Sequence, residues 1–270
     1  AIFSFKEQSM LSYLTDFGFS NKIINDFFQP FFSGIFLEPD LKTSSRMFEF
    51  VYKMFGEGYA AVPKAGIEAI PKQLFRNLKN TTFNFNTKVA SLNGSEIMLE
   101  DDTKLESLFT IVATDASNLI PNLKMNSIKW KSCHVLYFET KSRVIRRKLI
   151  GLIAEKESLI NNIFYATSLK TATQTKKELL SVTIVDDKNL THDLLIKRVK
   201  CELKKYCGIH YDKFIKHYHF PMALPNLVDL QYNMAPSETC LAPNIFLAGD
   251  TQLNGSLNAA MISGETAALG

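Results

Sequence analysis

The feature that most constrains the fold is the final part of the chain, residues 245–264. It reads as a short apolar strand, then Gly249 and Asp250, a glycine turn, and an apolar helix that starts at Ser256. A helix N-terminus presents unpaired N–H groups and partial positive charge, so this order suits an anionic or phosphate-bearing cofactor. The competing interpretation is a strand, turn and helix without a ligand, in which Asp250 only caps the last helix.

This closing segment resembles the C-terminal motif of the flavin-dependent amine oxidase and phytoene desaturase superfamily. In that superfamily the Asp of the sequence A-G-D meets the ribityl and pyrophosphate part of FAD, and the next helix points its N-terminus at the flavin. The resemblance implies FAD as the cofactor, with contacts at Gly249, Asp250, Ser256, Ala260 and Met261. The last two would act through their backbone N–H groups, and Ser256 would cap the helix or contact the pyrophosphate.

Earlier segments run in the order seen in desaturase-like members of the superfamily. They are residues 30–37, 41–45, 55–58 and 63–74. In the family, the last of these leads into a strand whose backbone touches the adenine. This resemblance makes Val89 a further candidate cofactor contact, and residues 110–116 are similar to the family's V-V-x-A-T-P strand and turn.

One family feature is missing from the sequence. No G-x-G-x-x-G follows a strand, and the glycine pairs at 56 and 58 and at 249 and 255 have the wrong spacing for a dinucleotide-binding turn. We therefore expect the chain to be the C-terminal portion of a longer flavoprotein, lacking the N-terminal dinucleotide-binding motif.

The apolar pattern predicts helices first and strands later. Helical spacing covers residues 11–28, broken by Gly18 and resumed after a cap at Ser20, and Pro30 should end the run. Helical spacing returns at 45–55 and 67–78. Strands are expected at 83–85, 89–92, 97–99, 109–113, 134–139, 149–153, 162–166, 179–185 and 214–220, and a helix at 190–206. The nearly all-apolar run 109–113 should be covered on both faces.

These elements predict an α+β / α/β fold that is part of a two-lobe FAD-dependent oxidoreductase. An antiparallel sheet with helices, residues 1–62 and 118–239, would form the substrate-binding lobe. Residues 63–117 and 240–270 would form a partial FAD-binding lobe.

Composition limits the partners. Of the 270 residues, 46% are apolar and 21% charged, which is typical of a folded protein, and a net charge of +4 is too weak to indicate nucleic acid binding. The basic run at 141–148 is interpreted as a solvated turn, with peripheral membrane contact as the alternative. Four cysteines without a C-x-x-C pair favour a reduced, cytoplasmic protein.

The catalytic residues stay unknown at this level. Amine oxidases often carry a Lys on a substrate-domain strand that reaches flavin N5 through water, but the comparable residues 132–137 contain none. His134 and Lys64 are the polar groups to inspect, although core or surface roles are favoured for both. His217 and His219 would share one strand face, and we expect packing there rather than a metal site.

The 21 phenylalanines admit two interpretations. Core packing explains most of them. Alternatively, Phe31, Phe32 and Phe36 line a tunnel for a hydrophobic substrate, as in desaturase relatives.

The resemblance implies an FAD-dependent oxidoreductase that removes a hydride from a C–C or C–N bond, more desaturase-like than amine-oxidase-like, with an undetermined electron acceptor. The alternatives are a flavin-fold protein that binds a ligand without turnover and a fragment that cannot hold FAD on its own.

Overall fold

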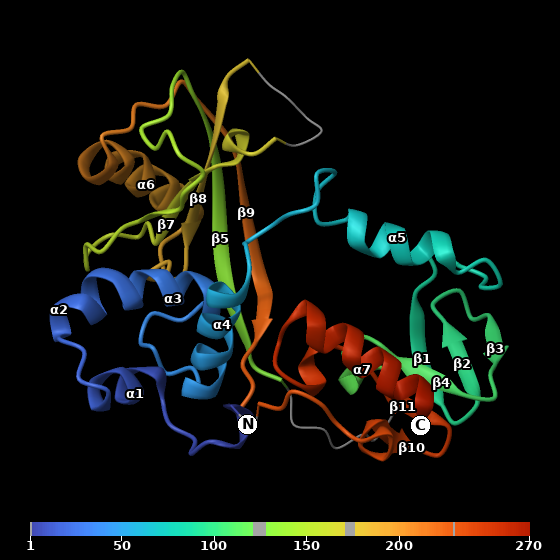
Figure 1. Ribbon diagram of the computed structural model, residues 1–270. Helices are drawn as coiled ribbons and strands as arrows, with labels where there is room; N and C mark the ends of the chain where they lie inside the picture. The colour runs from blue at the N-terminus through green and yellow to red at the C-terminus, as the bar shows by residue number, and fades with distance from the viewer. Residues whose placement is uncertain (1, 121–127, 171–175, 229) are drawn as a thin grey trace.

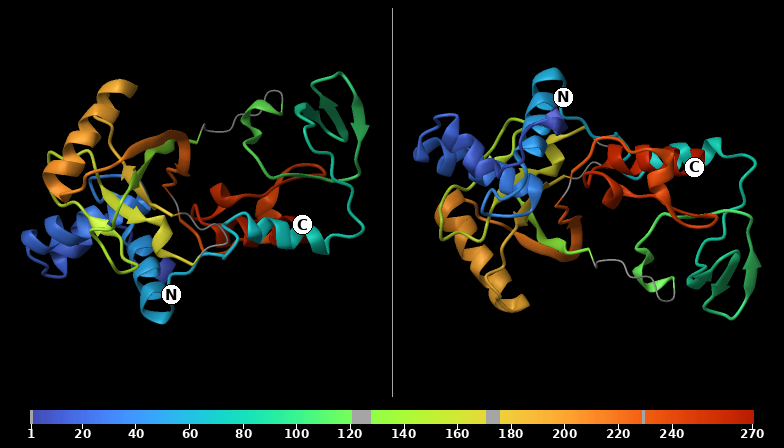
Figure 2. Two further views of the ribbon diagram at one scale, coloured as in Figure 1. Left: turned by 90° about the horizontal axis from the view of Figure 1, so that it is seen from above. Right: turned by 90° about the horizontal axis from the view of Figure 1, so that it is seen from below.

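The computed structural model describes residues 2–120, 128–170, 176–228 and 230–270, whose elements gather in two halves (Figure 1). One half contains helices α1–α4 and α6 with a five-stranded sheet, and the other contains α5, α7 and two three-stranded sheets. The chain passes to the second half after α4, returns before β5, and leaves again after β9 (Figure 2). This mixture agrees with the predicted α+β / α/β fold, and the predicted lobe boundaries remain a prediction.

The N-terminal helices are α1 (Met10–Asp16), α2 (Asn21–Ile23), α3 (Gln29–Phe36) and α4 (Ser45–Glu57). A π-helical turn, Ile24–Phe28, joins α2 to α3, and the N–H of Gln29 donates to the carbonyl of Ile24. The prediction that Pro30 ends the helical run is wrong. Pro30 is the second residue of α3, a position where its missing N–H costs little, so the wide turn and the proline together keep the run helical.

Aromatic side chains fill the core between these helices. The buried members come from α1, the π turn, α3, α4 and one loop, and they are Met10, Leu14, Ile24, Phe28, Phe32, Phe36, Leu41 and Phe48. Phe32 is completely buried, and its ring lies edge-on to that of Phe48 with centroids 4.9 Å apart. Of the twelve phenylalanines between Phe3 and Phe55, four are buried in this core and Phe19 and Phe31 pack against it, so core packing accounts for half of this enrichment.

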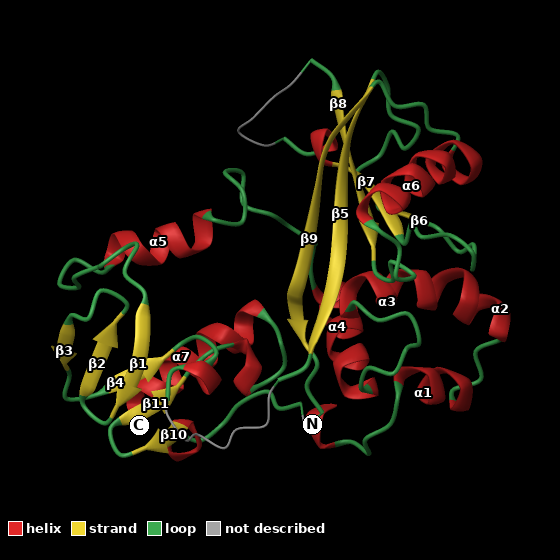
Figure 3. Cartoon of the chain, turned by 180° about the vertical axis from the view of Figure 1, so that it is seen from behind, coloured by secondary structure: helices red, strands yellow, loops and turns green. Residues whose placement is uncertain are grey.

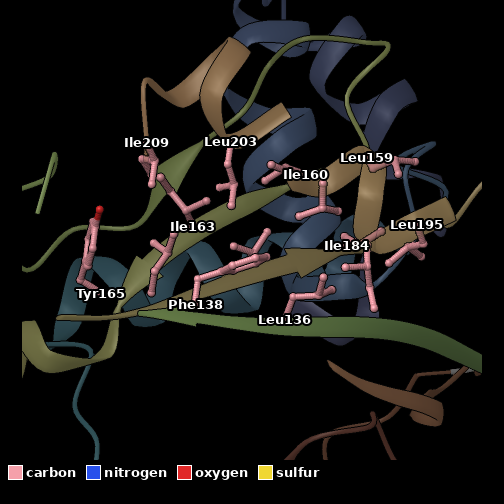
Figure 4. Packing of buried hydrophobic residues seen from close by; sticks show 14 residues of the cluster. Leu136, Phe138, Leu159, Ile160, Ile163, Tyr165, Ile184, Leu195, Leu203 and Ile209 are labelled. Carbon is pink, nitrogen blue, oxygen red and sulfur yellow. The ribbon is translucent and has the colours of Figure 1, made fainter. Parts of the chain in front are cut away.

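The large sheet is antiparallel throughout, in the order β6-β7-β8-β5-β9. Its strands are β5 (Trp130–Thr140), β6 (Gly151–Leu152), β7 (Asn162–Tyr165), β8 (Glu178–Ile184) and β9 (Lys213–Pro225). Helix α6 (His192–Cys207) covers one face, and Figure 4 shows the side chains of Phe138, Leu203 and their neighbours packed between helix and sheet. The expected strands and helix of this region are present, although β6 is shorter than predicted.

Strand β9 extends beyond the prediction because it runs through Pro221. Phe220 pairs with Cys133 and Leu224 pairs with Lys131, so three residues of β9 face one residue of β5. This bulge lies in the outermost described strand of the sheet, where a proline is tolerated. It directs the end of β9 toward the other half.

The second half contains α5 (Ala69–Asn77), α7 (Leu257–Leu269) and two small sheets. The first sheet is the meander β1 (Val89–Asn93), β2 (Glu96–Leu99) and β3 (Lys104–Glu106). The second is β10 (Cys240–Ala242), β11 (Ile245–Leu247) and β4 (Thr110–Val112), in which β11 and β4 are parallel.

Two strand predictions fail in this half. Residues 83–85 form no strand, because Phe83 packs its ring on Phe75 of α5 with centroids 4.5 Å apart. The run 109–113 does contain β4, but it is not covered on both faces among the described residues. Phe109 is 65% exposed and Ile111 is 44% exposed, whereas Val112 is buried, so side chains of this run are covered on one face.

Candidate cofactor and substrate site

The junction between β11 and α7 is fixed by a glycine and a buried serine. Gly249 has φ of +133°, a conformation that favours glycine. Its N–H donates to Oγ of Ser263 (2.8 Å), and the same Oγ lies 2.9 Å from the Gly249 carbonyl, which can accept its proton. Ser263 is fully buried in α7 and was not singled out by sequence reasoning. A serine within a mostly apolar helix was the available signal.

Ser256 caps α7. Its Oγ accepts the N–H of Ala259 (3.1 Å) and donates to Oδ1 of Asn254 (2.7 Å). The N–H of Ala260 donates to the Ser256 carbonyl (3.0 Å), so this group already serves the helix.

The free amides of α7 therefore lie one turn earlier than predicted. Met261, the fifth helical residue, lies within the regular ladder of i to i−4 hydrogen bonds. Within the described parts of the chain, no hydrogen bond is recorded from the N–H of Leu257 or Asn258, the first two helical residues. A direct flavin contact through Ala260 and Met261 stays a prediction, and these two earlier amides are the freer donors.

Asp250 does not cap α7, so its interpretation as the cap of the last helix is wrong, and its contact with a ligand stays a prediction. It starts the short 3-10 turn Asp250–Gln252, and its carbonyl accepts the N–H groups of Leu253 (3.3 Å) and Gly255 (3.0 Å). Among the residues that the structure describes, no hydrogen bond or ion pair is recorded for its carboxylate. This carboxylate is half-buried and available to a ligand.

A cavity of about 690 Å³ lies beside the start of α7 and is lined by both halves. Gly255 and Ser256 contribute from the turn before α7, and Leu224 and Pro225 contribute from the end of β9. The apolar side chains Ile35, Phe36, Met47 and Val51 contribute from the N-terminal helices. The rest of the lining comes mainly from charged and polar residues of the loop before α4, from Lys131, and from residues that follow β9. Figure 3 shows the start of α7 next to the end of β9.

The other predicted contacts lie at separate cavities. Val89 lines a cavity of about 550 Å³ together with Ala113 and Thr114, at the end of β4. Met261 lines another of about 490 Å³ with Leu74 of α5. The described residues therefore bring Ser256 together with the substrate half, whereas Val89 and Met261 face different spaces.

Of the three phenylalanines predicted to line a tunnel, Phe36 lines the large cavity. Phe31 and Phe32 do not, and Phe32 belongs to the helical core. Lys64 is exposed in the segment before α5.

Lys131 at the start of β5 was missed by sequence reasoning. It lies one residue before the stretch 132–137 that was searched for a lysine, and it lines the large cavity. Its Nζ donates to Oγ1 of Thr43 (3.2 Å), and Thr43 in turn donates to Oε1 of Glu38 (3.0 Å). Burial lowers the pKa of Lys131, and the negative charge of Glu38 partly opposes this shift.

The basic run at 141–148 lies in the loop between β5 and β6, where Arg146, Arg147 and Lys148 are exposed. The solvated interpretation fits this placement, and membrane contact stays a prediction. No helix among the described residues has the length and apolar character needed to cross a bilayer.

His134 belongs to a histidine cluster on the face of the large sheet that α6 covers. Its Nδ1 lies 2.8 Å from Nε2 of His217, and its Nε2 lies 3.3 Å from Oδ2 of Asp187. Its ring stacks on His219 with centroids 4.2 Å apart, and the ring of His192 lies 4.8 Å from that of His217. In the described residues no group of three or more His, Cys, Asp and Glu side chains is arranged to hold a metal ion.

The cluster should make stability depend on pH. Burial, then the charge of His134 and its neighbours, lowers the pKa of His217 to about 4, and burial followed by His219 lowers that of His134 although Asp187 opposes it. The unfolded chain therefore binds more protons than the folded chain below about pH 6.5. We expect the free energy of unfolding to fall by roughly 1–2 kcal/mol, after allowance for solvent screening, as the pH drops from 6.5 toward 4.

Urea unfolding followed by the fluorescence of Trp130, the single tryptophan, measures this loss. His217→Gln should reduce the pH dependence. His210→Gln, which changes the exposed histidine outside the cluster, should leave it unchanged. Equal pH profiles for the wild type and His217→Gln would contradict the assignment.

A strand that ends in a glycine turn, followed by a helix with free N–H groups, is an arrangement by which proteins bind the phosphate groups of cofactors. A model of the flavin-containing amine oxidoreductase family matches residues 3–269, and the chain belongs to this family. The predicted superfamily, the FAD cofactor and the oxidoreductase class are thereby confirmed at the level of the family. A search of curated proteins gives no match.

Solved structures agree in fold. An oxidoreductase from Methanosarcina mazei is 12% identical with a TM-score of 0.76, and the match covers 98% of this chain and 69% of that one. A candidate protoporphyrinogen oxidase from Exiguobacterium sp. 255-15 is 14% identical with a TM-score of 0.71, covering 97% and 66%. Putrescine oxidase bound to putrescine is 12% identical with a TM-score of 0.61, covering 97% and 67%. The chain thus spans about two thirds of the length of these proteins.

Proposed function

We propose that this chain forms the substrate lobe and part of the cofactor lobe of an FAD-dependent oxidoreductase. The reaction is removal of a hydride from a C–C or C–N bond of a small hydrophobic substrate, more desaturase-like than amine-oxidase-like. The observation that carries the proposal is the cavity of about 690 Å³, because it joins the start of α7 to an apolar wall of the N-terminal helices. The lobes are residues 1–62 and 118–239 for the substrate, and 63–117 and 240–270 for the cofactor.

The residues around Gly249 fit the flavin-bearing end of FAD. Gly249 has a positive φ and no side chain, so a ligand can approach the backbone of the turn closely. The Asp250 carboxylate has no recorded partner among the described residues and can accept hydrogen bonds from a ligand. The N–H groups of Leu257 and Asn258 can donate hydrogen bonds to it. Bound FAD supplies the chemistry of hydride acceptance. The helix N-terminus would stabilise negative charge next to it.

The chain's own contribution is to hold the substrate and exclude water. Ile35, Phe36, Met47 and Val51 offer an apolar surface opposite Ser256. Hydride transfer needs chiefly correct positioning of the substrate, and such a wall provides it. Residues 132–137 contain no lysine, but Lys131 directly before them lines the cavity, so the desaturase-like alternative is supported by the apolar side chains of the cavity.

Titration of the purified chain with FAD, followed by quenching of flavin fluorescence, tests the proposal. The wild type should bind, and Asp250→Asn should weaken binding by about tenfold or more because a hydrogen bond to a charged group is lost. Asp102→Asn, at an exposed turn in a left-handed conformation that Asn tolerates, is the control. Equal binding by Asp250→Asn would contradict the proposal, and no binding by the wild type would favour the alternative of a fragment that cannot hold FAD on its own.

The second candidate function is ligand binding without turnover. Anaerobic mixing of the flavin-loaded protein with candidate hydrophobic substrates separates the two functions. Bleaching of the flavin absorbance indicates oxidation of the substrate, whereas binding without bleaching favours the second candidate.

A further inference from the structure

Lys131 and Glu38 are the charged groups of the large cavity for which no ion pair is recorded among the described residues. Among the described residues, no carboxylate lies within the 4.0 Å ion-pair distance of its Nζ, and Thr43 is its recorded hydrogen-bond partner. An ammonium group has three N–H donors, so Lys131 retains hydrogen-bonding capacity toward the cavity. Lys131 is half-buried, and a hydrogen bond that it makes there is stronger because less water surrounds it than at the surface.

The other charged side chains of this cavity are already matched. Glu7 lies 3.3 Å from Nε of Arg46, and Asp40 lies 2.6 Å from Nζ of Lys42. Glu38 accepts three hydrogen bonds, from the N–H of Asp40 (2.9 Å) and from the N–H (2.9 Å) and Oγ1 (3.0 Å) of Thr43. A ligand that enters this space therefore meets apolar side chains, carboxylates that are paired or hydrogen-bonded, and one incompletely satisfied cation.

The loop that holds Thr43 is itself well fixed. Leu37 and Leu41 both have positive φ values, 51° and 53°, which are uncommon for leucine and persist only where the surrounding structure holds them. Leu41 is buried in the helical core, and Glu38 ties the loop together through its three bonds. Thr43 therefore orients the Lys131 ammonium before any ligand arrives.

We propose that Lys131 binds the carboxylate end of an elongated hydrophobic substrate, whose apolar part lies on the wall formed by Ile35, Phe36, Met47 and Val51. This inference rests on the proposed function of the same cavity and names its substrate class as a hydrophobic carboxylic acid. A substrate with a protonated amine at that end is disfavoured, since it would meet the Lys131 ammonium.

Fluorescent probes of one chain length test the substrate class. Three dodecyl probes carry the same dansyl reporter and end in a carboxylate, a methyl ester or a primary amine. We expect the wild type to bind the acid about tenfold or more tightly than the ester, the size of one charge-assisted hydrogen bond, and to bind the amine least. Equal affinity for the acid and the ester would overturn the proposal.

Variants then assign the effect to Lys131. Lys131→Met keeps the apolar stem, and it should reduce acid binding to the level of the ester while ester binding changes less than about twofold. Lys131→Arg should retain the preference for the acid. Lys42→Met is the matched control, because Lys42 also lines the cavity but is paired with Asp40. A uniform loss for all three probes in Lys131→Met would show a structural role instead and overturn the proposal.

The flavin titration separates this inference from the proposed function. Lys131 is not among the predicted flavin contacts, so Lys131→Met should bind FAD like the wild type. Acid-selective probe binding without FAD binding would support the carboxylate site and contradict the oxidoreductase proposal for this chain. FAD binding with no preference among the probes would support the oxidoreductase proposal and overturn the carboxylate site.

Discussion

Replacing Glu202 by Ala should lower the free energy of unfolding by about 3–5 kcal/mol, the cost of breaking a buried, hydrogen-bonded charge pair. Glu202 is 6% exposed on α6. Its Oε1 accepts Nε of Arg198 (2.8 Å), and its Oε2 accepts the N–H of Leu159 (2.8 Å), the N–H of Ile160 (3.3 Å) and the hydroxyl of Ser158 (2.9 Å). The alanine variant removes the recorded acceptor of the buried Leu159 N–H and of the Arg198 Nε–H. It also removes one of the two acceptors recorded for the Ile160 N–H and for the Ser158 hydroxyl.

Urea unfolding monitored through Trp130 measures the loss, because this residue lies in the sheet that α6 covers. Glu202→Gln should fall between the wild type and the alanine variant, since one amide oxygen still accepts. Glu155→Ala, at an exposed position near the same loop, should change stability by less than about 0.5 kcal/mol. A loss below about 1 kcal/mol for Glu202→Ala would contradict the prediction and would mean that water replaces the carboxylate as the hydrogen-bond acceptor.

Replacing Phe32 by Ala should cost about 3–5 kcal/mol, in the range of large-to-small substitutions of buried aromatic residues. Phe32 is completely buried, and its ring lies among those of Phe28, Phe36 and Phe48 at centroid distances of 6.3, 5.6 and 4.9 Å. The cavity left behind would lie beneath the wall that Phe36 presents to the candidate substrate. Stability and probe affinity should therefore fall together.

Phe17→Ala is the matched control, because this phenylalanine belongs to the same aromatic group but is 69% exposed. It should cost less than about 1 kcal/mol. Thermal unfolding by circular dichroism suits this comparison, since the residues concerned lie in or next to helices. Equal losses for the two variants would contradict the burial assigned to Phe32.

Local patterns predicted the regular elements well. The helix 190–206 and the hairpin turn at Asn93 and Gly94 were expected at almost their observed bounds, because one-sided burial imposes a period of 3.6 or 2 on the sequence. The prediction that Pro30 ends the helical run was wrong because the effect of this proline depends on the π turn before it. The apolar pattern of the sequence did not indicate that turn.

The candidate site was predictable only in part. Gly249 and Ser256 belong to a contiguous motif, so their roles in the turn and the cap could be anticipated. Lys131 and Thr43 are 88 positions apart, and only the packing of β5 beside the loop before α4 brings them together. Residues 83–85 alternate like a strand, yet no neighbouring strand is available to pair with them among the described residues.

The bulge in β9 has a consequence for behaviour at high concentration. An exposed border strand of 13 residues offers a row of backbone groups to which another molecule can add its own strand, and such addition starts aggregation. Pro221 supplies no N–H, and the irregular spacing from Pro221 to Ala223 breaks the repeat that an incoming strand would need. The same distortion that turns Leu224 and Pro225 into the cavity wall thus also protects the sheet from growing beyond one molecule.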